Sequence, residues 1–115
     1  MEKKKLGQWM LLAVVCLSFS VGEIYAQKHE FADFKRYAKE NATLAQPVKK
    51  EKRVVFMGNS ITEGWVRTHP DFFKTNGYIG RGISGQTSYQ FLLRFREDVI
   101  NLAPALVVIN AGTND

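Results

Sequence analysis

Three turns that lie far apart in the sequence contain the residue types that acyl transfer requires. They are residues 58–60, 82–85 and 112–114, and together they offer a serine hydroxyl, backbone N–H groups that glycine leaves approachable, and a side-chain amide. A serine nucleophile and N–H donors that hold a developing oxyanion are the essential parts of an acyl-transfer site. We therefore treat these three turns as the candidate site, provided that the fold brings them together.

Apolar segments before these residues predict the strands that would position them. Residues 54–57 are a continuous apolar run, typical of a strand buried on both faces. Residues 78–79 begin a weaker strand that leads into the glycine-rich segment 80–85, and residues 106–109 predict a third strand that is apolar throughout. In an open parallel sheet the carboxyl ends of the strands share one edge, where ligands bind. We therefore expect the three turns to converge at that edge.

Helices are predicted before and between the strands. Residues 29–42 carry an amphipathic pattern with Asn41 as its stop, residues 61–66 predict a short helix, and residues 67–77 carry the turn signals of a loop. The apolar side of the first helix consists of Phe31, Phe34, Tyr37 and Ala38.

The clearest helix covers residues 87–102, with Thr87 and Gln90 at capping-box spacing. Its predicted buried stripe consists of Leu92, Phe95, Val99 and Leu102, whereas Arg94, Glu97 and Asp98 are assigned to other faces. The order helix and then β-α-β-α-β predicts an α/β fold with a parallel sheet and helices on both faces. With strand order 2-1-3, residues 106–109 would form an edge that no helix covers.

Composition excludes several other classes of protein. The 115 residues carry a net charge of +5, one cysteine and two histidines, which is too little for a disulfide framework or a structural zinc site. The only dense basic cluster, residues 49–53, contains Glu51 and no aromatic residue, and we interpret it as a solvated linker. Because no nucleic-acid motif is present, we expect no nucleic acid as a partner.

The N-terminal residues have the pattern of a secretory signal peptide. Three lysines at residues 3–5 precede the uncharged stretch 6–22, and Ala26 is a small residue at the expected cleavage point. A retained membrane anchor is the alternative, although the stretch is at the short end for spanning a bilayer. We expect export to the periplasm or secretion, with membrane contact only in transit. The predicted divisions are residues 1–26 as the signal peptide, 27–52 as an N-terminal helix and charged linker, and 53–115 as the first part of an α/β domain.

At the candidate site the sequence resembles the GDSL/SGNH hydrolase family. Residues 55–62, 82–88 and 112–115 are similar to the first three sequence blocks of that family. The resemblance implies a flavodoxin-like three-layer α/β/α fold with a parallel sheet, of which only the first three strands are present. It also implies an esterase or lipase that cleaves acyl or acetyl esters of a carbohydrate or lipid.

The resemblance also assigns roles to the candidate residues. Ser60 holds the position of the family's nucleophile, and its N–H, the Gly85 N–H and the Asn114 side chain would form the oxyanion hole. The substrate would be a small ester, and no metal or organic cofactor would be required.

Two features depart from the pattern of the family. Asn59 stands where the family usually has aspartate, and the family's last block, an Asp-x-x-His that completes the triad, is absent from the 115 residues. Neither His29 nor His69 matches the family's histidine. Because a serine nucleophile needs a base within hydrogen-bond reach, we expect the chain to be an N-terminal fragment with little or no activity.

Two other functions fit parts of the sequence. Gly80, Gly82 and Gly85 match the G-x-G-x-x-G turn of a dinucleotide-binding domain, although the acidic residue expected after the next strand is missing. A non-catalytic carbohydrate-binding relative is also compatible with the aromatic residues Trp65, Tyr78 and Tyr89. Three ordered blocks favour the ester hydrolase over both alternatives.

Overall fold

The computed structural model describes residue 5, residues 7–10 and residues 30–115. The chain divides into two compact units, Met1–Phe31 and Ala32–Asp115, and the second unit contains the sheet. The predicted signal peptide lies almost wholly outside the described residues, so it stays a prediction. Among the residues that are described, no helix is both long enough and apolar enough to cross a membrane.

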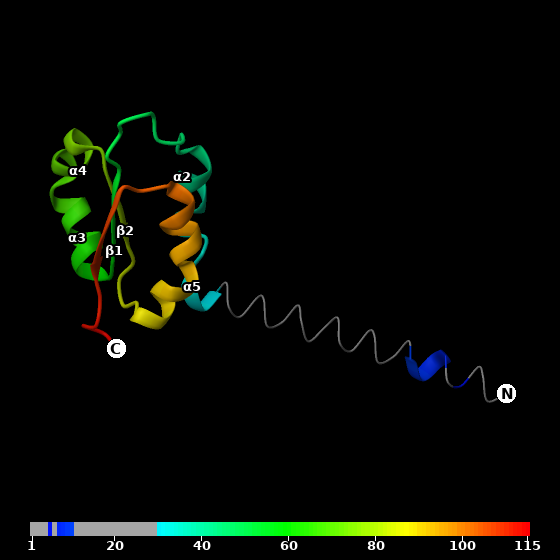
Figure 1. The fold of residues 1–115 in the computed structure, drawn as a ribbon. Helices are drawn as coiled ribbons and strands as arrows, with labels where there is room; N and C mark the ends of the chain where they lie inside the picture. The colour runs from blue at the N-terminus through cyan, green and yellow to red at the C-terminus, as the bar shows by residue number, and fades with distance from the viewer. Residues whose placement is uncertain (1–4, 6, 11–29) are drawn as a thin grey trace. The chain divides into compact units, whose positions relative to one another are not determined.

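Three parallel strands form one sheet, with β1 in the centre (Figure 1). The strands are β1 (Val54–Gly58), β2 (Tyr78–Gly82) and β3 (Leu106–Asn110), in the spatial order β2-β1-β3. The register pairs Gly58 with Gly82 on one side and with Asn110 on the other, so all three strands end at the same level. The shared carboxyl edge is confirmed, and the observed order is the 2-1-3 order under which residues 106–109 are expected to form an uncovered edge.

Helices lie on both faces of the sheet, which gives the predicted α/β/α layers (Figure 1). On one face are α3 (Ser60–Thr68) and α4 (Pro70–Asn76). On the other face are α5 (Ser88–Asp98) and the short 3-10 helix η1 (Ile100–Leu102), with α2 (Ala38–Thr43) in contact with α5.

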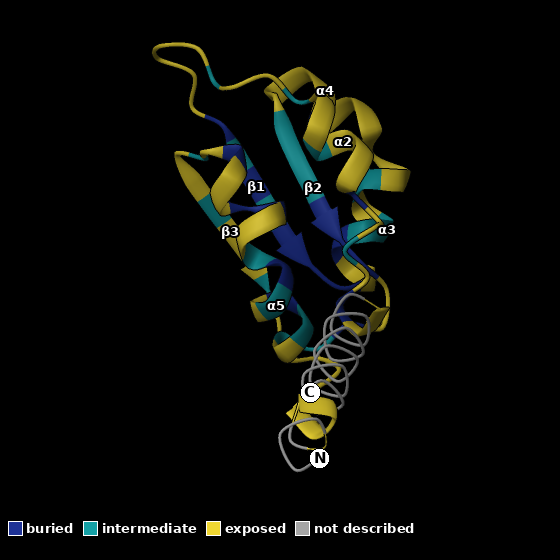
Figure 2. Ribbon diagram, turned by 90° about the vertical axis from the view of Figure 1, so that its right-hand side faces the viewer, coloured by how far each residue is buried: buried dark blue, intermediate teal, exposed yellow. Residues whose placement is uncertain are grey.

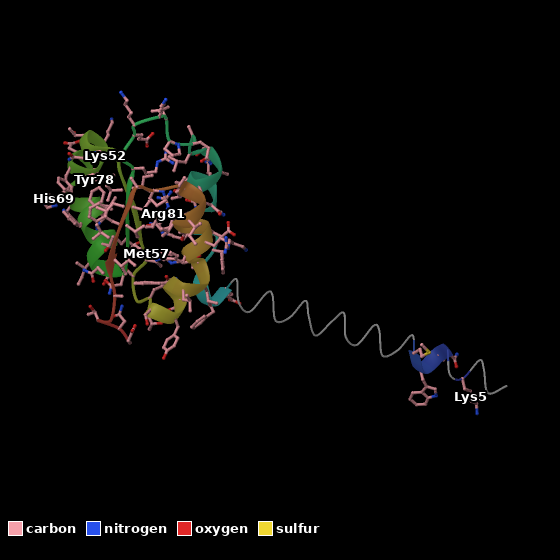
Figure 3. The ribbon with its side chains drawn as sticks, viewed as in Figure 1. Lys5, Lys52, Met57, His69, Tyr78 and Arg81 are labelled. Carbon is pink, nitrogen blue, oxygen red and sulfur yellow. The ribbon has the colours of Figure 1, made fainter. Side chains whose placement is uncertain are left out.

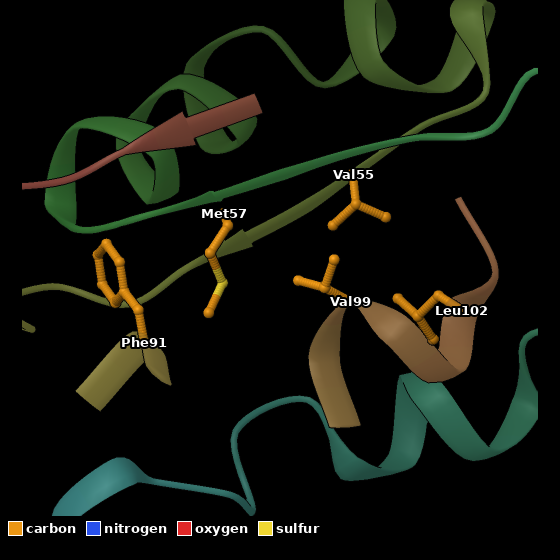
Figure 4. Close-up of a cluster of buried hydrophobic side chains, with 5 residues drawn as sticks. All are labelled: Val55, Met57, Phe91, Val99 and Leu102. Atoms are coloured by element: carbon orange, nitrogen blue, oxygen red, sulfur yellow. The ribbon is translucent and has the colours of Figure 1, made fainter. Parts of the chain in front are cut away.

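The central strand β1 presents a different set of side chains to each helical layer. Val55 and Met57 are buried with Phe91, Val99 and Leu102 between the sheet and the α5–η1 layer (Figure 4). Burying a side chain of this size stabilises the folded state by about 1.5–3 kcal/mol. On the other face, the Phe56 ring centroid lies 5.5 Å from that of Trp65 and 5.3 Å from that of Phe73. Because both faces of β1 are covered, its sequence is continuously apolar.

Most of residues 67–77, where the sequence predicts a loop, form helix α4 (Pro70–Asn76), and residues 67 and 68 are the end of α3. Pro70 occupies the first turn of α4, where a missing N–H costs nothing, and Gly77 ends the helix in the left-handed region with φ of 65°. The turn residues thus mark the two ends of a seven-residue helix. Phe73 explains why the segment is helical, because it packs under α4 against Phe56 and Trp65.

The predicted helix over residues 29–42 is shorter than expected. Only Ala38–Thr43 forms an α-helix in its second half, because residues 33–37 make turns and Asp33 has a left-handed φ of 52°. Tyr37 is buried as predicted, but Ala38 is exposed. The Tyr37 hydroxyl donates a hydrogen bond to the Gly82 carbonyl oxygen, so this segment is held by a polar contact with the end of β2.

The predicted buried stripe of residues 87–102 is only partly correct: Val99 and Leu102 are buried and Phe95 packs against them, but Leu92 is not buried and α5 already ends at Asp98. The capping box of α5 is confirmed, since the Thr87 N–H donates to the Gln90 side chain over 2.8 Å. However, Leu92 is 76% exposed, whereas Arg94 and Asp98 are buried beside Phe91. The two charged residues are buried because they pair with each other, Nη1 to Oδ2, over 2.8 Å.

The charged linker is only partly solvated. Arg53 is buried, and it donates to the Leu102 and Ala45 carbonyl oxygens over 2.8 Å each while it pairs with Glu51 over 3.0 Å. The prediction of a solvated linker is therefore wrong for Arg53, which clamps the start of β1 to η1.

Strand β3 is the exposed edge that the strand order predicts. Leu106 is 57% exposed and Ile109 is 56% exposed, in contrast to the buried residues of β1 (Figure 2). No described helix covers this edge.

Candidate active site

The first block of the site is a sharp passage from strand β1 to helix α3. Asn59 follows Gly58 and caps α3, because its Oδ1 accepts a hydrogen bond from the Ile61 N–H over 3.1 Å. Asn59 is only 1% exposed. An amide oxygen can accept this bond as a carboxylate oxygen would, so Asn59 can do the capping work of the aspartate that the resemblance implies here.

Ser60 is the first residue of α3, and its side chain is exposed. Since Asn59 is the cap, the Ser60 hydroxyl is not needed to cap the helix, and it takes part in no hydrogen bond with the rest of the described chain. The N-terminus of a helix carries partial positive charge, which favours an anion there. Ser60 is thus an accessible hydroxyl in a place that stabilises developing negative charge.

Two glycines of β2 allow α3 to lie close against the strand. A Cβ atom on Gly82 would lie 2.3 Å from the Glu63 backbone nitrogen, and one on Gly80 would lie 2.2 Å from Val66 Cγ2. Packing against α3 therefore accounts for two of the three glycines that fit the dinucleotide-binding pattern. Gly82 is required because the helix backbone, and not a ligand, approaches it.

The second block, which contains Gly85, is anchored to α3. The Ser84 N–H donates to Glu63 Oε2 over 3.0 Å, and the Ser84 hydroxyl donates to the same oxygen. Gly85 follows with a φ of 78°, a conformation that glycine adopts without strain. Because Glu63 lies one helical turn after Ser60, a single short helix holds both the candidate nucleophile and the Gly85 turn.

The carboxylate of Glu63 is stabilised in its charged form. The hydrogen bond from the Ser84 hydroxyl is the largest cause of a lowered pKa of Glu63, and an ion pair with Arg36 over 3.2 Å adds to it. At neutral pH the Gly85 turn is therefore held by a full negative charge.

The third block is joined to the second block. Asn114 Nδ2 donates to the Gln86 carbonyl oxygen over 3.0 Å, and the Asp115 carboxylate accepts from the Ser88 N–H and hydroxyl over 2.7 and 2.6 Å. These two bonds lower the pKa of Asp115, the hydroxyl bond more than the backbone bond. An amide nitrogen has two N–H donors, so Asn114 keeps one for a ligand.

A buried polar cluster behind the site was not predicted from the sequence. Arg94 is its centre, and its Nη2 donates to the Gly58 and Arg81 carbonyl oxygens over 3.2 and 2.9 Å. Its Nε donates to Gln86 Oε1 over 2.6 Å. Arg94 and Asp98 do stand at the i,i+4 spacing of a helical ion pair, but that spacing is more often found on exposed helix surfaces.

Asn41 extends this cluster to α2. Its Oδ1 accepts two hydrogen bonds from Arg81, over 3.0 and 2.7 Å, and its Nδ2 donates to Asp98 Oδ1 over 2.7 Å. The sequence predicts Asn41 as a helix stop, but the helix continues to Thr43 and the side chain joins two buried charges.

The one histidine that the structure describes, His69, does not lie beside Ser60. His69 lies between α3 and α4, about 13 Å from Ser60 at 1.5 Å per helical residue (Figure 3). Its Nδ1 is 2.8 Å from the Thr68 hydroxyl. His29 lies outside the described residues. The described residues also contain no group of three or more His, Cys, Asp or Glu side chains that could hold a metal ion.

Comparison with solved structures identifies the family of this chain, although no protein-family profile and no curated protein sequence matches it. A GDSL-like lipase from Bacteroides thetaiotaomicron is 93% identical over 73% of this chain, with a TM-score of 0.72. The chain belongs to the GDSL/SGNH hydrolase family. A second structure, assigned as an acylhydrolase of Bacteroides fragilis, is 81% identical over 72% of the chain, with a TM-score of 0.71.

The 115-residue chain matches only part of each of these proteins. It covers 41% of the lipase and 40% of the acylhydrolase. Its three-stranded α/β/α unit is therefore consistent with part of the GDSL/SGNH hydrolase fold.

Proposed function

We propose that this chain carries the nucleophile and the oxyanion hole of a serine ester hydrolase that acts on acyl or acetyl esters of a carbohydrate or lipid. The observation that carries the proposal is the position of Ser60. Its hydroxyl is exposed at the N-terminus of α3 and makes no hydrogen bond with the described residues, and it lies at the same edge of the sheet as the turns of Gly85 and Asn114. The names of the two similar structures support the same class of reaction.

In the proposed mechanism, Ser60 Oγ attacks the carbonyl carbon of the ester while a base takes the hydroxyl proton. The negative charge that moves onto the carbonyl oxygen is held by the N–H groups of Ser60 and Gly85 and by Asn114 Nδ2. Removing one such donor typically raises the barrier by about 3–4 kcal/mol. Collapse of the intermediate releases the alcohol, which takes a proton from the base, and water then hydrolyses the acyl-serine.

The base is the part of this mechanism that the described residues do not supply. In the proposal it is the histidine of an Asp-x-x-His segment, which the resemblance to the family implies and the 115 residues do not contain. Loss of triad members costs roughly 10⁴–10⁶ in rate in well-studied serine hydrolases. The chain by itself is therefore expected to cleave esters at a very low rate.

Hydrolysis of p-nitrophenyl acetate tests this proposal. The assay compares the 115-residue chain with the same chain extended by the segment that completes the 93%-identical lipase. We expect turnover in the extended protein, its loss in Ser60→Ala, and little change in Thr68→Ala, which removes an exposed hydroxyl at the other end of α3. Turnover that persists in Ser60→Ala would contradict the proposal, as would tight binding of NAD without ester cleavage.

We also propose that residues 1–26 direct export. The support is the basic, apolar and small-residue order of the N-terminal sequence. Expression in a Gram-negative host followed by mass spectrometry of the periplasmic fraction tests it, and a mature chain that starts at Gln27 is expected. Recovery of the chain from the cytoplasm with Met1 or Glu2 as its first residue would contradict the proposal.

A further inference from the structure

Arg94 is the most deeply buried charged residue of the sheet-containing unit. It is 0% exposed. Its guanidinium donates hydrogen bonds to the side chains of Gln86 and Asp98 and to the carbonyl oxygens of Gly58 and Arg81. Asp98 neutralises its charge over 2.8 Å. A buried ion pair is often no better for stability than well-packed apolar residues, so stability alone does not explain why one stands here.

The acceptors of Arg94 belong to the segments that position the candidate site. Gly58, whose carbonyl oxygen accepts from Nη2, is two residues before Ser60. Gln86, whose Oε1 accepts from Nε, follows Gly85 directly. The backbone carbonyl of the same Gln86 accepts from Asn114 Nδ2 over 3.0 Å.

The guanidinium therefore contacts the block that contains Ser60 directly, through Gly58. It reaches the blocks of Gly85 and Asn114 through Gln86. A guanidinium is planar and has fixed donor directions, so it sets the distances between its acceptors as well as their separate positions. Gln86 is itself held on a second side, because its Nε2 donates to the Ala32 carbonyl oxygen over 2.8 Å. A change at Arg94 thus reaches all three blocks.

We propose that Arg94, acting through Gln86, is a positioning residue that fixes the spacing between the Ser60 nucleophile and the oxyanion donors Gly85 and Asn114. This inference rests on the ester hydrolase function proposed above. Displacement of catalytic groups by about 1 Å can lower a rate about 100-fold, because the reacting atoms leave the geometry of attack. Arg94 contacts no substrate in this proposal, so it acts on kcat and leaves substrate binding nearly unchanged.

Arg94→Lys in the extended protein tests the inference. Lysine keeps the charge and can reach Asp98 or one carbonyl, but a single ammonium cannot bond Gly58, Arg81 and Gln86 in the same arrangement. With p-nitrophenyl acetate we expect kcat to fall by at least about 10-fold and KM to change by less than about 2-fold. The matched control is Arg96→Lys, an exposed arginine on the same helix, which is expected to change neither constant.

Each result of this test either supports or overturns the proposal. Activity is compared per folded molecule, well below the thermal midpoint of each variant. Folded Arg94→Lys with unchanged kcat overturns the positioning role while Ser60→Ala still abolishes turnover. An unmodified extended protein without Ser60-dependent turnover overturns the proposed function, and the positioning role with it.

Gln86→Met provides a second variant if Arg94→Lys does not fold. Methionine has nearly the shape of glutamine but cannot accept from Arg94 Nε, while the backbone carbonyl that bonds Asn114 remains. We expect a smaller fall in kcat at constant KM. In the 115-residue chain itself, the amide NMR signals of Ser60, Gly85 and the Asn114 side chain are expected to shift in both variants and not in Arg96→Lys. Unchanged signals and an unchanged kcat in folded Gln86→Met would overturn the role.

Discussion

Adjacent residues divide two tasks at the start of α3. Asn59 is buried and accepts a hydrogen bond from the Ile61 N–H at the start of the helix. Ser60 is exposed and makes no hydrogen bond within the described chain. A nucleophile that also capped its helix would lose the cap whenever it reacted. Placing the cap one residue earlier keeps the helix N-terminus intact throughout the proposed reaction.

Replacing the cap should therefore destabilise the fold. Asn59→Ala is expected to lower the free energy of unfolding by about 1–2 kcal/mol, because the Ile61 N–H loses its acceptor. Asn59→Asp keeps the acceptor and should retain most of the stability. Urea unfolding followed by circular dichroism measures both variants, and equal losses for the two would contradict a capping role.

Stability should also depend on the ionisation of Glu63. Its pKa is lower in the folded chain than its ordinary value, mainly because the Ser84 hydroxyl donates to the carboxylate. Such a group stabilises the folded state at pH values above its unfolded pKa, and this contribution is lost as the pH falls through the lower, folded pKa. Glu63→Gln is thus expected to be less stable by about 1 kcal/mol at neutral pH.

The same difference should shrink toward zero in acid, where the carboxylate of the unmodified chain is protonated. Urea titrations of both proteins at a series of pH values from neutral to strongly acidic measure it. A difference in stability that stays constant across that range would show that the charge on Glu63 is not what holds the Ser84 turn.

At the scale of elements, the close contact between α3 and β2 positions Ser60 relative to the Gly85 turn. The strand can approach the helix backbone only where it has no side chain, and Gly82 is that place. Gly82→Ala should lower the free energy of unfolding by more than about 2 kcal/mol, because a Cβ atom would overlap the Glu63 nitrogen. Gly64→Ala in α3 is the control, since its Cβ atom would meet nothing within 4 Å, and it should stabilise the helix by about 0.5–1 kcal/mol. Thermal unfolding distinguishes the two, and a Gly82→Ala protein as stable as the unmodified chain would contradict the close packing.

The elements also show what the sequence can and cannot predict. β1 was predictable because a strand covered on both faces needs a continuous apolar run. β3 was also predictable from its apolar run, although it forms an exposed edge of the sheet. Thr87 and Gln90 fix the start of α5 through a local hydrogen bond. The buried face of α5 was not predictable from hydrophobicity, because Arg94 is stable in the interior only through partners that are distant in the sequence. In α4, Pro70 and Gly77 indicate two ends, but only the packing of Phe73 decides that a helix joins them.

In the candidate site, too, features set by local sequence were predictable and contacts between distant segments were not. The convergence of the three blocks was predictable, because parallel strands place their carboxyl ends together. The residues that hold those blocks, Glu63 and Gln86, were not predictable, since the sequence gives no local pattern for a hydrogen bond between separate turns.

At the scale of the whole molecule, the open edge at β3 is the least protected part of the sheet. It combines unpaired backbone groups with exposed Leu106 and Ile109, which favours pairing with another chain. We expect the 115-residue chain to associate as its concentration rises, and Ile109→Lys to shift it toward the monomer. Light scattering coupled to size-exclusion chromatography measures this. Leu92→Lys is the control, because Leu92 is 76% exposed but lies on α5, away from the edge. Equal effects of the two substitutions would show that general solubility, and not the edge, governs association.

The contact between Asp115 and Ser88 has a practical consequence for anyone who purifies this protein. It fixes the last residue of the chain to the first turn of α5, beside the Gly85 turn and next to Asn114. Anything joined after residue 115, whether a longer polypeptide or an affinity tag, starts beside the Gly85 turn. A C-terminal tag on the 115-residue chain would therefore begin next to Gly85 and Asn114, two of the proposed oxyanion donors.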